Sequence, residues 1–561
     1  MSRRAYYFNS INNFILEDDE RVLGQLLIND EFETTDLQKM AWRSEIQILK
    51  EQLVEFLQGD IIFEYSIPRM GHRVDVICII NGIIFLLEFK VGDKEYKKST
   101  SDQVMDYALD LKYFHDKSGT RYLVPINVST RAVGKQNEYY CMTDNIYNTL
   151  FCNKNNIGST IREVISRIND TSLSALEWIN SRYAPTPTII ESAQALYRKH
   201  GVEDISRNDA GAKNLSATAN CISNIIEQAK QGSKKAICFV TGVPGAGKTL
   251  AGLNIANQRL KVAEDEHAVF LSGNGPLVQV LQEALARDSV IKNKIKKENA
   301  LKATKAFIQN IHHFRDEYLK NSQAPTEKVV VFDEAQRAWN QHQTRKFMIQ
   351  KRGRPDFNQS EPEFLIEVMN RHQDWCVIVC LIGGGQEINT GEAGLVAWMQ
   401  ALQASYPDWQ MHYSNLIVNQ DNYLKDAAIK NWVCKTGVEQ KHLHLATSVR
   451  SFRSEKVSAW VHALLDMDEQ AKSLCEEVQS NYPIVLTRDL QKAKAWVKAQ
   501  AKGSERYGLV ASSGARRLKA LGVHVKNEID VANWFLNPKY DVRSSYFLED
   551  VATEFDVQGL E

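Results

Sequence analysis

Apolar and polar residues alternate in blocks along the later part of the chain. From Ala236 onward, short apolar runs typical of buried strands alternate with longer stretches of helical periodicity. The first runs are AICFVTG, AVFLSGN, VVVFDEAQ and CVIVCLIGG. This alternation predicts a parallel sheet covered by helices. A later set, LHLATSVRS, PIVLTRD, YGLVASS and SYFLEDVATEF, predicts the strands of a second, similar α/β unit.

The earlier part of the chain is organised differently. Its first ~180 residues mix helix-like and strand-like patterns. The segment RYAPTPTII is the best linker candidate, because its two prolines favour extended backbone. We therefore predict an N-terminal α/β domain at 1–181, a linker and connecting helix at 182–215, a first parallel-sheet lobe at 216–430 and a second lobe at 431–561.

Composition places the chain among globular proteins without strong global charge. Its 561 residues suggest roughly three or four domain-sized units. The formal net charge is -1, so a nucleic-acid surface would have to be local. The nine cysteines form no CxxC pair, and the start MSRRAYYFNSINNF lacks the apolar core of a signal peptide. We expect a cytoplasmic protein that does not associate with membranes.

The segment GVPGAGKT at 242–249 has the full pattern of a phosphate-binding loop. It follows an apolar strand and precedes a helical stretch, which is the context this loop requires. Gly242, Gly245 and Gly247 allow backbone N–H groups to converge on phosphate oxygens. Lys248 would reach the β- and γ-phosphates, and the Thr249 hydroxyl would hold Mg²⁺. The loop predicts ATP as a ligand.

Other predicted strands end in groups that suit the same site. VVVFDEAQR ends in Asp333, expected in the Mg²⁺ shell, and Glu334, expected to polarise the attacking water. The strand CVIVCLIGGGQEI ends near Gln386, which could sense the γ-phosphate. Arg450, at the end of LATSVRSFR, could stabilise the charge that develops in phosphoryl transfer.

A hairpin near the N-terminus carries opposed carboxylates. Asn81-Gly82 lies between two apolar runs, which is a strong signal for a two-residue turn. This turn places Ile80 opposite Ile83, and by the same register Asp75 faces Glu88 and Arg73 faces Lys90. Directly opposed carboxylates lie roughly 5 Å apart and repel each other. We therefore expect a divalent cation to bind between them.

The second part of the chain resembles superfamily 1 helicases. DEAQR, GGGQ and SVRS are similar to motifs II, III and IV, SGNGPLVQVLQEAL to motif Ia and TEFDVQGLE to motif V. The closest family resemblance is to the Schlafen group 3 type of DNA/RNA helicase domain, over ~215–561. It implies two RecA-like lobes, with Glu561 on the ribose and Thr553 on the nucleic-acid backbone. The motif VI arginine of this family is missing, so we expect an incomplete second lobe, in a chain that is either a fragment or naturally short.

The N-terminal pattern of an Asp followed by Glu-x-Lys resembles PD-(D/E)XK nucleases, which have a restriction-endonuclease-like α/β fold. The resemblance implies that Asp75 and Glu88 hold Mg²⁺ and that Lys90 orients the hydrolytic water. Glu45, in a helical stretch, could supply a further carboxylate ligand. Gln103 and Tyr107, four residues apart on a predicted helix, resemble the QxxxY element of recombination-type exonucleases, which contacts nucleic acid.

Together these features predict a metal-dependent nuclease fused to a helicase-like ATPase that acts on DNA or RNA, with DNA favoured. Its cofactors would be ATP and Mg²⁺, with Mn²⁺ as an alternative at the nuclease site. Fusions of this kind resemble bacterial repair and anti-phage defence proteins. The alternative is an ATP-binding switch whose N-terminal domain binds nucleic acid without cleaving it.

Overall fold

The structure, a computed structural model, describes most of the chain. The described residues are 4–30, 35–67, 72–142, 144–168, 170–181, 183, 188–197, 209–243, 245–259, 267–383, 392, 394–446, 452–479 and 484–560. Contacts divide the chain into two compact units, one of Met1–Pro185 with Lys456–Tyr507 and one of Thr186–Glu455 with Gly508–Glu561. No described helix combines the length and the apolar composition needed to cross a membrane.

The first unit is built on a mixed sheet with the strand order β1-β2-β3-β4-β5-β6. Strands β1 to β4 pair antiparallel, whereas β4, β5 and β6 pair parallel. The strands are β1 (Tyr7–Ser10), β2 (Asp60–Ile67), β3 (His72–Ile80), β4 (Ile83–Lys90), β5 (Leu123–Ser129) and β6 (Leu150–Cys152).

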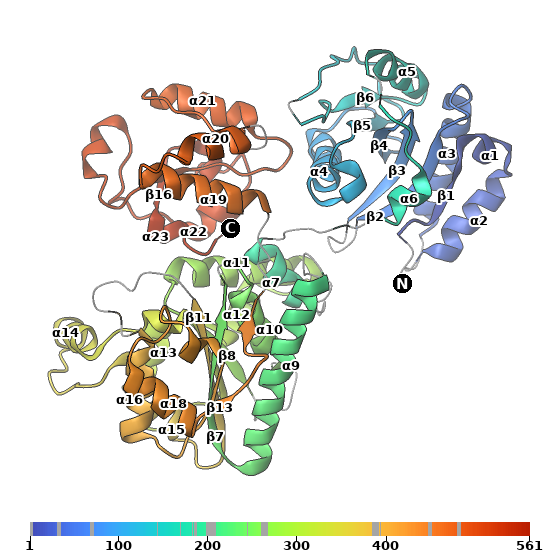
Figure 1. Ribbon diagram of the computed structural model, residues 1–561. Helices are drawn as coiled ribbons and strands as arrows, with labels where there is room; N and C mark the ends of the chain where they lie inside the picture. Colours follow the sequence, from blue (N-terminus) through green and yellow to red (C-terminus); the bar gives the residue numbers. More distant parts are fainter. Residues whose placement is uncertain are drawn as a thin grey trace. The chain divides into compact units, whose positions relative to one another are not determined.

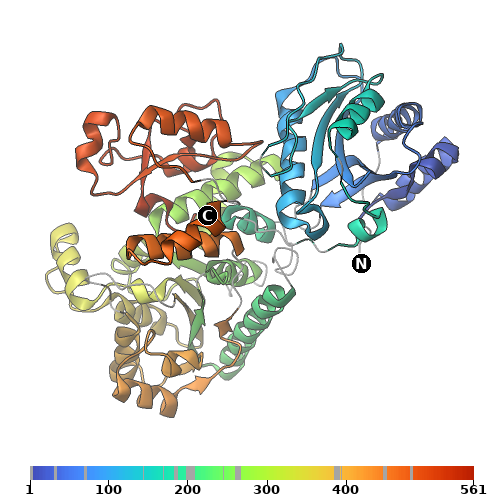
Figure 2. The same cartoon turned by 45° about the horizontal axis from the view of Figure 1, so that its top comes forward.

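Helices cover both faces of this sheet, as Figure 2 shows for the N-terminal part drawn in blue. One face packs against α1 (Ile11–Leu16), α2 (Asp19–Asn29), α3 (Asp36–Gln52) and α5 (Ile157–Arg167). The other packs against α4 (Lys98–Phe114) and α6 (Ala175–Ile179). The unit also includes α20 (Ala471–Gln479) and α21 (Leu490–Gln500), and α19 (Phe452–Leu465) lies largely within it.

The predicted hairpin is confirmed. Asn81 and Gly82 have φ angles of 52° and 76°, as a tight turn of this type requires. A side chain at Gly82 would lie 1.9 Å from the Thr171 carbonyl oxygen, so the position also excludes larger residues. The strand register runs from Ile80 opposite Ile83 to Val76 opposite Leu87, as predicted.

The second unit contains a parallel sheet with the order β13-β12-β7-β11-β10-β8-β9, and β14 also pairs with β7. The strands are β7 (Lys235–Gly242), β8 (Ala268–Ser272), β9 (Ile308–Asn310), β10 (Val329–Asp333), β11 (Cys376–Gly383), β12 (Gln410–Tyr413), β13 (Val438–Glu439) and β14 (His444–Leu445). The four apolar runs that begin at Ala236 all form strands, so the predicted parallel sheet is confirmed.

Two layers of helices enclose this sheet (Figure 1). One layer holds α7 (Ile189–Tyr197), α9 (Asp209–Gly232), α10 (Lys248–Arg259), α11 (Gly275–Asn293) and α12 (Lys297–Phe307). The other holds α13 (Ile311–Tyr318), α14 (Gln341–Arg352), α15 (Glu361–Asn370), α16 (Gly394–Ser405), α17 (Leu416–Asn419) and α18 (Ala427–Thr436). A side chain at Gly252 in α10 would come within 2.7 Å of Leu381 in β11, so glycine allows α10 to approach the sheet closely.

The later strands differ in part from the prediction. The segment LHL was expected to begin a strand of a second lobe. It instead contains β14, which pairs with the end of β7, because Leu445 is buried in the same core. PIVLT forms no strand over its described residues 484–487, where Leu486 is 99% exposed. The other two predicted segments form β15 (Leu509–Ala511) and β16 (Val551–Thr553), which pair parallel.

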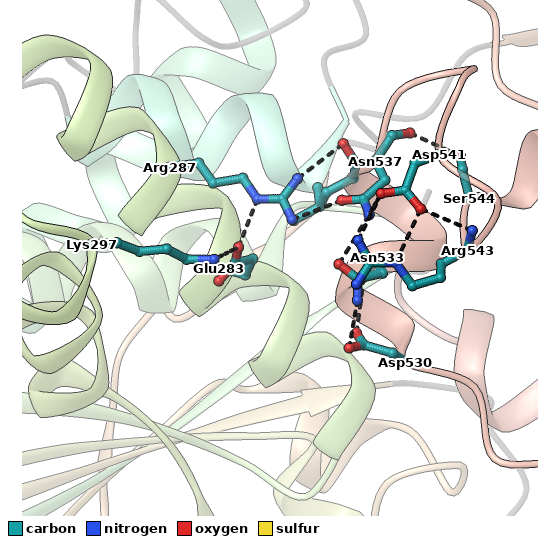
Figure 3. A network of polar contacts seen from close by, with 10 residues as sticks. Glu283, Arg287, Lys297, Asp530, Asn533, Asn537, Asp541, Arg543 and Ser544 are labelled. Atoms are coloured by element: carbon teal, nitrogen blue, oxygen red, sulfur yellow. Dashed lines mark hydrogen bonds and ion pairs between the residues drawn. The ribbon is translucent and has the colours of Figure 1, made fainter.

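The C-terminal segment of the second unit docks on α11 through a polar network. Its helices are η4 (Arg516–Leu521), α22 (Val531–Leu536), η5 (Ser545–Phe547) and α23 (Glu554–Val557). Figure 3 shows Arg287 extending from α11 to the end of α22. Its guanidinium donates to Asn537 Oδ1 at 2.9 Å and to the Leu536 carbonyl at 3.2 Å, and it binds Glu283 at 2.7 Å.

We predict that Arg287→Ala loosens this segment from α11. The change removes hydrogen bonds from a charged donor, which we expect to cost on the order of 2 kcal/mol. Hydrogen exchange across 531–548 should accelerate. Lys297→Ala is the matched control, because Lys297 binds Glu283 but not the C-terminal segment in the described contacts. Equal exchange in both variants would contradict the prediction.

Candidate functional site

The phosphate-binding loop connects β7 to α10 in the second unit. Gly245 and Gly247 have φ angles of 71° and 78°, in the left-handed region that glycine adopts without strain. Lys248 is buried, and its Nζ donates to the carbonyl oxygens of Gly242 at 3.2 Å and Val243 at 3.4 Å. The loop's own backbone therefore holds the lysine at the end of β7.

Thr249 and Asp333 meet at the edge where β7 and β10 end. The Thr249 hydroxyl donates to Asp333 Oδ2 at 3.1 Å. The other oxygen of Asp333 is buried and has no hydrogen-bond partner among the described residues. Burial, with the adjacent charge of Glu334, raises the pKa of Asp333 to about 7. An unpartnered carboxylate oxygen beside a hydroxyl fits the oxygen ligands that Mg²⁺ prefers.

Glu334 follows in a strained turn held by Gln336. Glu334 has a φ of 53°, which is uncommon for a residue other than glycine. Gln336 Nε2 donates to the Glu334 carboxylate, and Gln336 Oε1 accepts from the Gly383 N–H at 3.1 Å. Gln336 thus connects Glu334 to the end of β11. Sequence reasoning gave Gln336 no role of its own, although it belongs to the DEAQ motif.

The remaining predicted residues of this unit stay predictions. Gln386, Arg450 and Glu561 lie outside the described residues. Thr553 caps α23, with its hydroxyl donating to Asp556 Oδ2 at 2.7 Å.

A second group of polar residues lies on the sheet of the first unit. Val76 pairs with Leu87, and continuing that register places Asp75 opposite Glu88. Asp75 Oδ2 accepts the Phe89 N–H at 2.7 Å, and Lys90 Nζ binds Glu88 Oε1 at 2.6 Å. At this end of the hairpin, a side-chain carboxylate therefore replaces a backbone carbonyl as the hydrogen-bond acceptor between the two strands.

The structure adds one carboxylate to this group and changes the partners of Arg73. Phe63 pairs with Val76 and Tyr65 with Val74, which places Glu64 opposite Asp75. Arg73 was expected to face Lys90 on β4. Its ion-pair partners instead lie away from β4: Arg73 Nε is 3.5 Å from Glu64 Oε2, and Arg73 Nη1 is 3.7 Å from Asp30 Oδ1. Sequence reasoning missed Glu64, and its only signal is one acid within an apolar strand.

These carboxylates share one electrostatic environment. Burial, followed by the charge of Glu88, raises the pKa of Asp75 to about 7. Burial raises the pKa of Glu88 while the ammonium of Lys90 opposes the shift. Burial on α3, with the charges of Asp75, Glu64 and Glu88, holds the pKa of Glu45 well above its usual range. The four acids are therefore close enough to repel one another.

Some of their oxygens suit a cation. Glu45 and Glu88 are 5% and 2% exposed. In each, Oε2 is buried without a hydrogen-bond partner in the part of the chain that the structure describes. Over the same residues, no set of three or more His, Cys, Asp or Glu side chains is arranged as a ready metal cluster. The donor chemistry fits a divalent cation, but the ligands would have to close around it.

Helix α4 contributes the predicted Gln103 and Tyr107. Gln103 Nε2 donates to the Tyr107 hydroxyl at 2.7 Å, so the two side chains share a face as predicted. Burial raises the pKa of Tyr107 to about 12, and the charges of Glu88 and Asp75 add to this shift. The α4 pair therefore lies within the field of the acidic group.

Comparisons with known proteins give results of different strength. Among curated proteins, no match was found. Among solved structures, the Pyrococcus furiosus Hef helicase domain has 14% identity and a TM-score of 0.23, covering 60% of this chain and 86% of that one. A structure of Drosophila ORC bound to DNA has 12% identity and a TM-score of 0.17, covering 64% and 94%. Similarity at this level indicates nothing about activity.

A family model gives a firmer result. The model described as "Schlafen group 3, DNA/RNA helicase domain" matches residues 235–561. This range begins at β7 and includes Lys248, Thr249, Asp333 and Glu334. Because it covers more than half of the chain, the protein belongs to the Schlafen group 3 DNA/RNA helicase domain family.

Proposed function

We propose that this protein hydrolyses ATP in its second unit and couples the hydrolysis to a nucleic acid. The contact between Thr249 and Asp333 carries this proposal, because it joins the phosphate-binding loop to an unpartnered buried carboxylate oxygen. Thr249 and Asp333 would hold Mg²⁺, which would neutralise charge on the phosphates. Lys248 would exchange its carbonyl partners for phosphate oxygens.

Glu334 would be the residue that activates the attacking water. Its carboxylate follows directly after Asp333, and Gln336 restrains it. A carboxylate held in this way can orient a water molecule and accept its proton. The link from Gln336 to Gly383 ties this group to the strand that precedes Gln386.

For the first unit we propose a metal-dependent nuclease. The carboxylates of Asp75, Glu88 and Glu45 would hold a divalent cation, either Mg²⁺ or Mn²⁺, which would supply an activated water and offset charge on the phosphodiester. Lys90 would position that water or bind the scissile phosphate. Gln103 and Tyr107 would contact the nucleic acid next to the cleaved bond. A role in repair or anti-phage defence is compatible with this pairing of activities.

The first test concerns ATP turnover. We expect Lys248→Ala to lower turnover by on the order of a hundredfold or more, because the phosphates lose a preorganised charge. Glu334→Gln should keep ATP binding and lose turnover. Lys302→Ala, at an exposed lysine of α12, is the control and should behave like the wild type. A steady-state phosphate-release assay with and without single-stranded DNA or RNA measures these effects.

Two results would contradict this assignment. ATP turnover that survives Lys248→Ala would show that the phosphate-binding loop takes no part in hydrolysis. ATP binding without any turnover in the wild type would instead support an ATP-binding switch.

The second test concerns cleavage. Labelled single-stranded DNA, duplex DNA and RNA would be incubated with Mg²⁺ or Mn²⁺, with and without ATP. We expect Glu88→Gln to abolish cleavage of whichever substrate the wild type cuts, because it removes a cation-binding charge and keeps the side-chain volume. Glu163→Gln, at a partly exposed glutamate of α5 that pairs with Arg167, is the matched control. Cleavage that persists in Glu88→Gln would disprove this site.

The third test uses pH. Asp75 has a pKa raised from 3.8 to about 7, so the folded protein binds this proton more tightly than the unfolded chain. The resulting stability is complete below about pH 4 and is lost as the pH rises through about 7. Asp75→Asn should remove this loss. As the pH rises from 5 to 8 without divalent cations, the unfolding free energy of the variant should increase relative to that of the wild type by on the order of 2 kcal/mol.

Denaturant unfolding of the full chain at both pH values measures the difference. Added Mg²⁺ should stabilise the wild type at pH 8 and leave Asp75→Asn unchanged. A difference that does not depend on pH would show that Asp75 does not titrate between pH 5 and pH 8 in the folded protein.

A further inference from the structure

Glu64 occupies a break in the alternation of strand β2. Residues two apart in a regular strand share a face. Phe63 nevertheless packs in the core beneath α3, and Tyr65 packs in the core beneath α4. Their partners Val76 and Val74 divide in the same way, so both strands change face between these positions.

The backbone at this break is strained. Glu64 has a φ of 51°, in the left-handed region that is costly for a residue with a side chain. Strain of this kind persists only where the surrounding structure enforces it, and it concentrates at functional sites. The break sets Glu64 and Asp75 opposite each other between the two cores.

Two side chains hold the Glu64 carboxylate. Trp42 Nε1 donates to Oε1 at 2.7 Å, and Arg73 Nε lies 3.5 Å from Oε2. Trp42 precedes Glu45 by three residues on α3, so both side chains lie on one face of this helix. Arg73 precedes Asp75 by two residues on β3. Each anchor of Glu64 therefore belongs to an element that also carries a predicted cation ligand.

The surrounding acids point independently to a ligand. Glu45 and Glu88 are more than nine-tenths buried, and each has an oxygen without a hydrogen-bond partner in the described structure. Glu64 lies opposite Asp75 in the register of β2 and β3, and its charge helps to raise the pKa of Glu45. A carboxylate in this position adds negative potential to the group without having to contact the cation.

We propose that Glu64 is a positioning residue of the nuclease site: its contacts with Trp42 and Arg73 link the elements that carry Glu45 and Asp75, and its charge strengthens divalent-cation binding. This inference rests on the proposed nuclease function. A purely structural Glu64 would only satisfy Trp42 and Arg73 inside the fold. The two roles differ in whether cation affinity depends on the charge of residue 64.

Glu64→Gln separates these roles. It keeps the volume of the side chain and an oxygen for Trp42, but removes the charge. Mn²⁺ binding to the full chain would be measured by electron paramagnetic resonance, and the signal lost in Asp75→Asn defines the N-terminal site. We expect Glu64→Gln to weaken Mn²⁺ binding by about tenfold, as one charge several ångströms from the cation would. Cleavage at saturating metal should stay within about threefold of wild type.

Three further variants complete the comparison. Asp60→Asn removes an acid at the start of the same strand, where it accepts from the Ala175 N–H, and should leave Mn²⁺ binding unchanged. Glu64→Asp keeps the charge on a shorter side chain and should recover part of the affinity. If Glu64→Gln does not fold, Trp42→Phe tests the same anchor and should weaken Mn²⁺ binding in the same direction.

The outcomes separate this inference from the function on which it rests. Unchanged Mn²⁺ affinity in Glu64→Gln, with weakened affinity in Glu88→Gln, would make Glu64 a structural brace and overturn the inference alone. No Mn²⁺ signal at the N-terminal site of the wild type would overturn the proposed nuclease function as well.

Discussion

The hydrogen bond between Thr249 and Asp333 depends on the order of strands in the parallel sheet. Strand β11 lies between β7 and β10, and all three run in the same direction. Their carboxyl ends therefore meet at one edge, where 84 positions of sequence separate the two side chains. The phosphate-binding loop, the Glu334 turn and the Gln336 link all follow from that edge. Any change that shifted the register of β7 or β10 would therefore move these three features apart from one another.

The acidic group of the first unit is built on the opposite principle. Antiparallel strands bring Glu64, Asp75 and Glu88 side by side across the sheet, and α3 adds Glu45. In the second unit, strand ends deliver polar groups to an edge that loops and helix termini share. In the first, polar groups interrupt strands that are otherwise apolar, so their burial cost has to be met by partners such as Lys90, Trp42 and the Phe89 N–H.

Local sequence patterns predicted the parts of both sites that depend on local geometry. The Asn81-Gly82 turn determined the hairpin register, and the glycines of the loop matched its left-handed backbone. Non-local packing decided the rest. Glu64 joins the acidic group because strand β2 changes face, which no periodic pattern in the sequence encodes. The ion pair of Arg73 with Asp30 also depends on residues far apart in the sequence. The apolar pattern of LHL could not reveal that β14 completes the first sheet, nor could PIVLT show that its residues 484–487 would lie outside any strand.

The docking of the C-terminal segment on α11 has a mechanical consequence. Strand β8 ends at Ser272, which pairs with Asp333, and α11 begins three residues later. Its 19 residues span about 28 Å as a stiff rod. Arg287 grips the segment from the later half of that rod, whereas Asn274, at its start, donates to the Gln558 carbonyl. The helix thus contacts the C-terminal segment both beside the sheet edge where β8 and β10 end and in its later half, so a displacement of that segment would act on α11 at two separated points.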